Sequence, residues 1–585
     1  MNVNRPNRRF LILAVSFGLI IFIILAQASY YQVFGGRRAL AERPIVKEPA
    51  PRGMVVDSHG VPLIVNRHFF RVAATPNLIM GDIARDEVAK QLESLLGLPY
   101  ANTFSTLQGR QEYPFAILAD AISLEEANLL NETKQRLATE QGMFPLQHVY
   151  VTPMTRRSYP QGEALAHLTG FVSVEYGGVS GIEEYYDEFL PADGIGLLEE
   201  DTAALDALPA DVRRFLPSAP GKDLVLTVDR TIQWIIREEL RRGLEEFKAV
   251  SGSVIVLDPR TGALLGMVNL PDFDPNRYEQ APVEFFRNPA VSAQYEPGSV
   301  FKIVTMAAAL DSGMIEPTTI FTDTGSYTIG ERVVFNSDRN AYGEVTAAEA
   351  LARSLNVITA EISDTMGPEQ FYRYLRQFGL GEATKIDLSG EINGSIKTPA
   401  VPQWSRSDLG TNSFGQGLAV TPIQMANATA VIANGGKMMQ PYVVAARVAD
   451  ERVQFTKPAA VRQVISPEAA NELTEMMIQV VETSSVKAGV PGYRIAGKSG
   501  TAQIPLEDGS GYEKSETIVS FVGFAPAENP RFVLLVKMDR PDPTINQWAS
   551  HTAAPVFSRI AQRLLDYMNI PPDTALSSGE AATGE

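Results

Sequence analysis

The 585-residue chain contains no cysteine, and this absence removes several classes of protein. Disulfide-stapled secreted domains, thiolate zinc sites and dithiol redox centres all need cysteine. Histidine is also scarce. The five histidines are scattered, and none lie at the i, i+4 spacing that places two imidazoles on one metal ion. We therefore expect neither a metal nor a cofactor.

Positive charge is in short supply as well. The chain has 51 Lys and Arg against 68 Asp and Glu, which gives a net charge of −17. Phosphate backbones bind to cationic surfaces, so we expect no nucleic acid as a general partner. The hydrophobic share of 45% excludes disorder over most of the length, and the length predicts a few domains with well-buried cores.

One apolar run, residues 10–26, is near the lower length limit of a membrane-spanning helix. Basic residues lie on both sides of it, so charge does not decide its orientation. The short tail before it favours a cytoplasmic N-terminus, because large following domains are translocated regardless of their charge. We expect a cytoplasmic tail at 1–9, a transmembrane anchor at 10–28 and an extracytoplasmic remainder, as in a single-pass protein of the cell membrane. The rival is a cleaved signal peptide, because Ala-Gln-Ala at 26–28 fits a signal-peptidase site.

Turn signals and composition divide the rest of the chain. Residues 54–65 read as two short strands joined at Ser-His-Gly, and a helical stretch follows at 124–139. Residues 198–222 are rich in Ala, Asp and Pro and read as a linker. The last fifteen residues, 571–585, read as a disordered tail.

A second, larger domain opens near Val225. Two hairpins are predicted in it, one from the strands 253–257 and 263–268 and one from 517–524 and 531–538. They bracket a region of helical periodicity at about 302–433. This order predicts an α+β fold in which distant segments form an antiparallel sheet and a helical lobe is inserted between them.

Candidate chemistry begins at Ser299 and Lys302. Pro-Gly precedes Ser299, and the helix that follows, residues 303–310, is apolar on every side and must be buried. The i, i+3 spacing places the Lys302 amine on the same face as the Ser299 hydroxyl, where a desolvated amine can activate a serine. Glu296, just before this turn, reads as a solvated loop carboxylate. Ser-x-x-Lys also occurs at 484–487, so the spacing alone is a weak signal.

Two further triplets raise the specificity. Ser354-Leu355-Asn356 is the only Ser-x-Asn and lies within the helical lobe, and Lys498-Ser499-Gly500 is the only Lys-[Ser/Thr]-Gly and lies on an apparent strand. Each triplet alone could be a surface turn. Their joint occurrence in this order favours a catalytic site.

A phosphate-binding loop is the rival interpretation, because residues 492–499 satisfy Gly-x4-Gly-Lys-[Ser/Thr]. That motif needs a helix opening at the lysine. Here the pattern predicts a strand that runs into the lysine, and glycines and a proline follow it, which argues against an ATPase.

The three triplets resemble those of the penicillin-binding proteins, whose transpeptidase domains carry Ser-x-x-Lys, Ser-x-Asn and Lys-[Ser/Thr]-Gly in this order. The resemblance runs from about residue 44 to 565 and is closest to the class B branch. One departure is Trp-Ala-Ser-His at 548–551, where the family pattern has a Gly-Gly pair. Further segments similar to that family are Arg52–Asp57, Gly181–Leu190, Phe414–Gln424, Gly497–Gln503, Phe521–Pro526 and Ala553–Phe557.

This resemblance implies a penicillin-binding transpeptidase fold at 223–568 and a smaller pedestal, or dimerisation, domain at 44–197. The activity it implies is that of a peptidoglycan D,D-transpeptidase, which crosslinks stem peptides ending in D-Ala-D-Ala and is acylated by β-lactams. A membrane-embedded glycosyltransferase is the protein partner it implies. Septal and lateral wall roles both stay open.

The resemblance also implies a role for each motif residue. Ser299 would be the nucleophile and Lys302 its base, and Ser354 with Lys498 would return the proton to the departing D-alanine. Asn356 would bind the substrate amide and hold Lys302. The backbone N–H groups of Ser299 and Thr501 would bind the oxyanion. The hydroxyls of Ser499 and Thr501 would hold the terminal carboxylate, and Gly500 would leave room for the substrate strand.

Two alternatives remain within this chemistry. One is a serine hydrolase, either a D,D-carboxypeptidase or a relative of the β-lactamases, and the other is an inactive scaffold that binds the cell wall. The intact triplets speak against the scaffold. The chain length and the pedestal domain speak against the hydrolase.

Overall fold

The computed structural model describes residues 52–141, 144–173, 177–191, 222–450, 452–483, 485–506 and 511–572, and all of them belong to one compact unit. The predicted anchor at 10–28, nearly all of the predicted linker at 198–222 and residues 573–585 lie outside these ranges. Within the described ranges, no helix is both long and apolar enough to cross a membrane.

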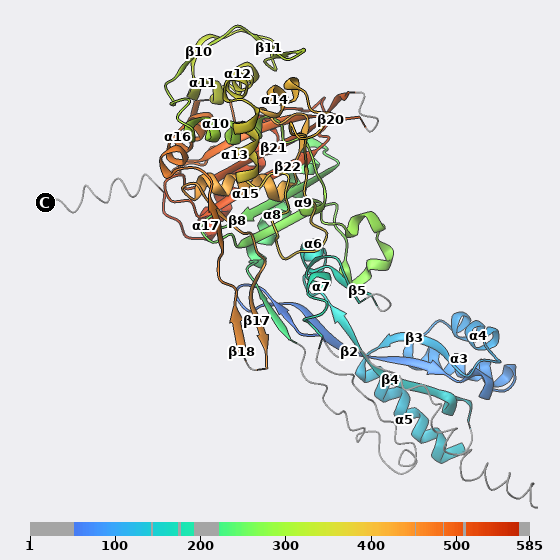
Figure 1. Ribbon diagram of the computed structural model, residues 1–585. Helices are drawn as coiled ribbons and strands as arrows, with labels where there is room; N and C mark the ends of the chain where they lie inside the picture. Colours follow the sequence, from blue (N-terminus) through green and yellow to red (C-terminus); the bar gives the residue numbers. More distant parts are fainter. Residues whose placement is uncertain are drawn as a thin grey trace, which may run out of the picture. The chain divides into compact units, whose positions relative to one another are not determined.

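A five-stranded antiparallel sheet forms the centre of the larger domain (Figure 1). Both predicted hairpins are confirmed, and they join edge to edge because β22 pairs with β8. The sequence-distant ends of the domain therefore build one sheet. Its strands, in spatial order, are β20 (Ala496–Pro505), β21 (Tyr512–Ala525), β22 (Phe532–Asp539), β8 (Ser251–Leu257) and β9 (Leu264–Leu270).

Side chains of the central strands alternate between two cores, as the two-residue period of a strand requires. Val254 and Val256 of β8 lie in the core that includes α8 (Arg230–Phe247) and α17 (Ala553–Tyr567). Ile255 and Leu257 lie in the core of the helical lobe. Both faces of the sheet are therefore covered by helices, which explains why these strands read as continuous apolar runs.

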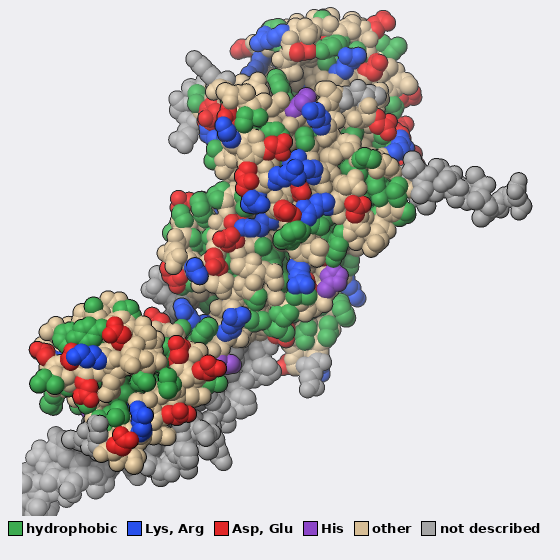
Figure 2. All heavy atoms as spheres, turned by 180° about the vertical axis from the view of Figure 1, so that it is seen from behind, with side chains coloured by type: hydrophobic (Ala, Val, Ile, Leu, Met, Phe, Trp, Pro, Cys, Tyr) green, Lys and Arg blue, Asp and Glu red, His purple; other side chains and the backbone are tan. Residues whose placement is uncertain are grey.

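Ion pairs also join helices α8 and α17. Arg559 and Arg563 of α17 each reach Glu239 of α8, at 2.8 Å in both cases. On the face shown in Figure 2, acidic and basic side chains of the described residues are interspersed.

The predicted helical lobe is confirmed in outline, and it carries short strand pairs that the sequence did not predict. Its helices are α9 (Pro289–Ser292), α10 (Lys302–Asp311), α11 (Ala347–Ala352), α12 (Asn356–Met366), α13 (Pro368–Gln377), α14 (Arg406–Asn412), α15 (Pro422–Ala433) and α16 (Pro467–Thr483). Its short strands are β10 (Ile320–Asp323), β11 (Ser326–Ile329), β12 (Arg332–Phe335), β13 (Gly343–Thr346), β14 (Ser395–Ile396), β15 (Leu418–Ala419), β16 (Lys437–Met439) and β19 (Ala460–Gln463).

The N-terminal part is built on a second sheet, and the predicted strand pair at 54–65 is confirmed as β1 and the start of β2. The predicted helix at 124–139 is confirmed as α5. The elements of this part are β1 (Val55–Val56), β2 (Pro62–Ala74), α3 (Asp82–Leu96), α4 (Tyr100–Gly109), β3 (Ala116–Ile122), α5 (Leu124–Gln141), β4 (Val149–Ser158), α6 (Ala166–Thr169), β5 (Phe171–Ser173), β6 (Gly177–Val179) and α7 (Gly181–Tyr185).

Strand β7 (Asp223–Leu226), which was predicted to open the second domain, lies in this N-terminal sheet instead. It pairs with β1 on one side and with β17 (Val444–Ala449) on the other, and β18 (Arg452–Phe455) completes the edge. Segments from both halves of the chain thus share one sheet, so the two predicted domains have no clean break at 222.

A buried ion network links two of the segments that resemble the family, Arg52–Asp57 and Gly181–Leu190. Glu183 is fully buried and binds Arg52 at 2.7 Å and Arg157 at 2.8 Å. Two guanidinium groups compensate the cost of burying one carboxylate. The residue after Arg52 must be glycine, because a Cβ at Gly53 would lie 1.9 Å from the carbonyl oxygen of Lys222.

Candidate active site

Ser299 lies in a 3-10 turn, Gly298–Phe301, that leads directly into α10. Ser299 is partly exposed, whereas every residue of α10 from Lys302 to Leu310 is buried. The predicted buried helix behind the serine is therefore confirmed. The lobe and the central sheet bury this helix, and Ser299 in the turn before it stays partly open to solvent.

The Lys302 amine connects the first motif to the second. Its Nζ donates to the backbone oxygen of Ser354 and to Asn356 Oδ1 at 2.8 Å, and it lies within hydrogen-bond distance of Ser354 Oγ, at 3.2 Å. The Asn356 amide is oriented in turn, because its Nδ2 donates to the Phe335 carbonyl at 3.0 Å. Within the described residues the Ser299 hydroxyl makes no hydrogen bond. The Lys302 side chain is held by Ser354 and Asn356 of the second motif.

Ser354 occupies the turn between α11 and α12 with a positive φ of 61°. A residue with a Cβ pays about 1–3 kcal/mol for such a backbone, and the surrounding packing must hold it there. The result is that both the hydroxyl and the carbonyl of Ser354 face the Lys302 amine. This strain was not visible in the sequence.

Lys498 is the second buried amine of the site. It lies on β20, is 1% exposed, and donates to the Ser499 carbonyl at 2.9 Å. Burial lowers the pKa of Lys498 to about 7. Burial, and next the charge of Lys498, hold the pKa of Lys302 well below its usual range. The sequence predicted a neutral amine at Lys302 but not a second one at Lys498.

Strand β20 packs directly on the turn that carries Ser299. A Cβ at Gly500 would lie 2.8 Å from the Pro297 oxygen and from the Val300 nitrogen. From the sequence, Gly500 was expected to leave room for the substrate strand. The structure adds a close contact between Gly500 and the nucleophile turn, which only glycine permits. Because β20 runs unbroken through Lys498 to Pro505, no helix opens at this lysine and the phosphate-loop hypothesis is excluded.

The departure at 548–551 lies beside the third motif. It forms a short 3-10 turn, Ala549–His551, and the Ala549 N–H donates to Thr501 Oγ1 at 3.0 Å. The Thr501 hydroxyl keeps its proton free to donate to a carboxylate. Trp548 is 48% exposed at this edge.

The expectation for Glu296 is wrong. Its side chain is buried, and its Oε1 accepts the Gly417 N–H at 3.0 Å and lies 3.4 Å from the Tyr512 hydroxyl. A loop carboxylate next to a Pro-Gly pair suggests solvent exposure, but Gly417 and Tyr512 come from segments more than 100 residues away. No local signal in the sequence indicates that they cover it.

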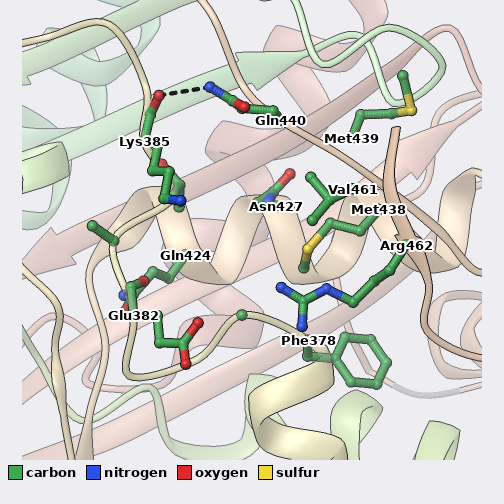
Figure 3. A pocket seen from close by; sticks show the side chains of 13 residues that line it. Phe378, Glu382, Lys385, Gln424, Asn427, Met438, Met439, Gln440, Val461 and Arg462 are labelled. Carbon is green, nitrogen blue, oxygen red and sulfur yellow. Dashed lines mark hydrogen bonds between the residues drawn. The ribbon is translucent and has the colours of Figure 1, made fainter. Parts of the chain in front are cut away.

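A separate hollow of about 130 Å³ lies between the end of α13, α15 and β16 (Figure 3). Lys385, Asn427 and Arg462 are among the side chains that line it. None of the residues of the three motifs lines this hollow, so it is distinct from the site at Ser299.

Two family models match the chain and cover most of it. The penicillin binding protein transpeptidase domain matches residues 252–562, and the penicillin-binding protein dimerisation domain matches residues 47–226. The three motifs all fall within the first match. The chain is an acyl-transfer enzyme that belongs to the penicillin-binding protein transpeptidase family.

Several relatives resemble the chain over nearly its whole length. Stage V sporulation protein D of Bacillus subtilis is 32% identical, with 97% of this chain and 87% of the relative covered. The peptidoglycan D,D-transpeptidase FtsI of Escherichia coli is 29% identical, with 99% and 95% covered. Among solved structures, penicillin binding protein 3 of Mycobacterium tuberculosis complexed with aztreonam is 27% identical with a TM-score of 0.68, with 90% of this chain and 98% of that chain covered.

Proposed function

We propose that the chain crosslinks peptidoglycan stem peptides as a D,D-transpeptidase, with Ser299 as its nucleophile. The observation that carries this proposal is the Lys302 amine, which is fully buried, bonded to Ser354 and Asn356, and lowered in pKa by burial and by Lys498. An amine kept neutral in this way can take a proton from a serine hydroxyl.

In the first half-reaction Ser299 Oγ attacks the carbonyl carbon of the penultimate D-alanine while Lys302 accepts the hydroxyl proton. The backbone N–H groups of Ser299 and Thr501 stabilise the oxyanion. The peptide bond then breaks, an ester joins Ser299 to the stem, and terminal D-alanine leaves. Its nitrogen receives a proton through the Ser354 hydroxyl with the help of Lys498, whose pKa of about 7 allows it to give and take a proton at neutral pH.

The substrate is held by the second and third motifs. Asn356 binds the substrate amide, and the hydroxyls of Ser499 and Thr501 hold the terminal carboxylate. In the second half-reaction an amine of a neighbouring stem attacks the ester, an amide crosslink forms, and the proton returns to Ser299. A β-lactam acylates the same serine but its ring-opened product stays attached.

We place this activity outside the cytoplasm, with residues 10–28 as a single membrane anchor, residues 44–197 as the pedestal and residues 223–568 as the transpeptidase domain. The two matching family models support a dimerisation module followed by a transpeptidase module, although the first match runs on to residue 226 and includes β7, and the apolar run at 10–26 supports the anchor. A membrane-embedded glycosyltransferase supplies the glycan strands that such an enzyme crosslinks.

The test is labelling with a fluorescent penicillin followed by mapping of the modified peptide. Ser299→Ala should abolish labelling, whereas Ser484→Ala, which alters the other Ser-x-x-Lys, should leave it intact. Labelling that survives Ser299→Ala would refute the assignment.

The lifetime of the adduct separates a transpeptidase from a hydrolase. A β-lactamase needs a base beside the deacylating water. Lys302, Ser354 and Lys498 are committed to acylation, and Glu296 is enclosed by Gly417 and Tyr512. The intact mass should show a penicilloyl adduct that lasts on the order of hours after free penicillin is removed, and its loss within seconds would indicate a β-lactamase.

A further inference from the structure

Glu296 is a buried carboxyl three residues before Ser299 that the proposed mechanism does not use. It is 9% exposed, and its Oε1 accepts the Gly417 N–H at 3.0 Å. Its Oε2 is buried and has no hydrogen-bond partner among the described residues. Burial raises the pKa of Glu296, and the Gly417 N–H opposes that rise. A buried carboxyl is costly, so its position next to the nucleophile calls for a physical account.

The partner of Glu296 belongs to a turn that touches the nucleophile turn directly. This turn, Phe414–Gly417, receives a hydrogen bond from the Gly298 N–H to the Gly415 oxygen at 3.0 Å. A Cβ at Gly415 would lie 2.3 Å from the Gly298 oxygen, and Gly415 has a positive φ of 78°. The two turns are therefore in backbone contact, and a shift of one moves the other.

A second contact links the same carboxyl to the central sheet. The Tyr512 hydroxyl lies 3.4 Å from Glu296 Oε1, and Tyr512 opens strand β21, opposite Pro505 of β20. Strand β20 itself packs on the nucleophile turn at Gly500. Glu296 thus stands where three segments meet: the Ser299 turn, the Phe414–Gly417 turn and the β20–β21 hairpin.

We propose that Glu296 is a positioning residue for Ser299. By accepting the Gly417 N–H, its carboxyl oxygen holds the Phe414–Gly417 turn against Gly298 and so fixes the direction of the Ser299 hydroxyl. The part of this statement that concerns catalysis rests on the proposed role of Ser299. The function belongs to an acceptor oxygen at this position and not to a charge, because both a carboxylate and a neutral carboxyl or amide offer that oxygen.

The experiment compares Glu296→Gln, Glu296→Ala and the matched control Glu284→Ala, which removes an exposed glutamate of the same domain. Glu296→Gln keeps the acceptor oxygen and should acylate with penicillin at close to the wild-type rate and with the same pH profile. Glu296→Ala should lower the first-order acylation step by about ten- to a hundredfold, since small displacements of a reacting group cost rate on that order. Glu284→Ala should change nothing.

Hydrogen exchange at the Gly417 amide gives a readout that does not depend on acylation. Exchange should quicken in Glu296→Ala and stay slow in Glu296→Gln, and thermal unfolding shows whether each variant is folded. Equal acylation in Glu296→Ala and wild type, or a displaced pH profile in Glu296→Gln, would overturn the positioning role. If the wild type shows protected Gly417 but no adduct on Ser299, the proposed function fails while the contact made by Glu296 stands.

Discussion

At the scale of single residues, the site depends on two amines that burial makes less basic. Lys302 is fully buried, and its pKa is held well below the usual 10.5 by burial and by Lys498. A base must be neutral to act, so acylation should rise with pH and reach its plateau well below pH 10, where an ordinary lysine would become neutral. Lys302→Arg should lower the acylation rate by about 10²–10⁴-fold, because a guanidinium cannot lose its proton.

The measurement is the rate of penicillin acylation between pH 5 and pH 10 at constant ionic strength. Thermal unfolding of the Arg variant serves as the control, because a larger side chain in a fully buried position can disturb packing. A folded Arg variant that acylates normally would show that Lys302 is not the base.

At the scale of secondary-structure elements, strand β20 and the nucleophile turn fit together because Gly500 has no side chain. A Cβ there would lie 2.8 Å from two backbone atoms of the turn, so the strand or the turn must move. Gly500→Ala should lower acylation by about a hundredfold and destabilise the fold by about 1–3 kcal/mol. Gly489→Ala is the matched control, since a Cβ at Gly489 meets nothing within 4 Å.

Acylation rates and urea unfolding of the two variants decide the point. If Gly500→Ala acylates like Gly489→Ala, the contact between β20 and the turn is too soft to position Ser299.

At the scale of the whole molecule, the described residues form one compact unit, and Arg52 is the first of them. Arg52 compensates the buried Glu183, and β1 pairs with β7 directly after it. A chain beginning at Arg43 should therefore be soluble and bind penicillin, because it lacks the proposed anchor but keeps this network. A chain beginning at Met54 loses Arg52 and should unfold at lower temperature, since removal of one partner of a buried ion pair costs about 3–5 kcal/mol.

Differential scanning calorimetry and penicillin labelling of the two shortened chains check this. Aggregation of the longer one, or recovery of the full-length protein in the soluble fraction after ordinary lysis, would contradict the single-anchor proposal.

The sequence by itself determined what depends on neighbouring residues. Alternation and turn signals predicted both hairpins of the central sheet, and an unbroken apolar pattern predicted the buried helix behind Ser299. The short spacings Ser-x-x-Lys and Ser-x-Asn identified Ser299 with Lys302, and Ser354 with Asn356, as candidate site residues. These features are local, because the period of a strand or a helix is set by residues a few positions apart.

Only the tertiary structure decided what depends on residues far apart in the chain. The Lys302 amine meets Ser354 across 52 residues, Glu296 is covered by Gly417 across 121, and Gly500 lies against the turn of Ser299. Strand β7 pairs with β1, although the sequence placed it in another domain. Burial, pKa and close backbone contact follow from which surfaces meet when the chain packs, and no local pattern in this sequence encodes that choice.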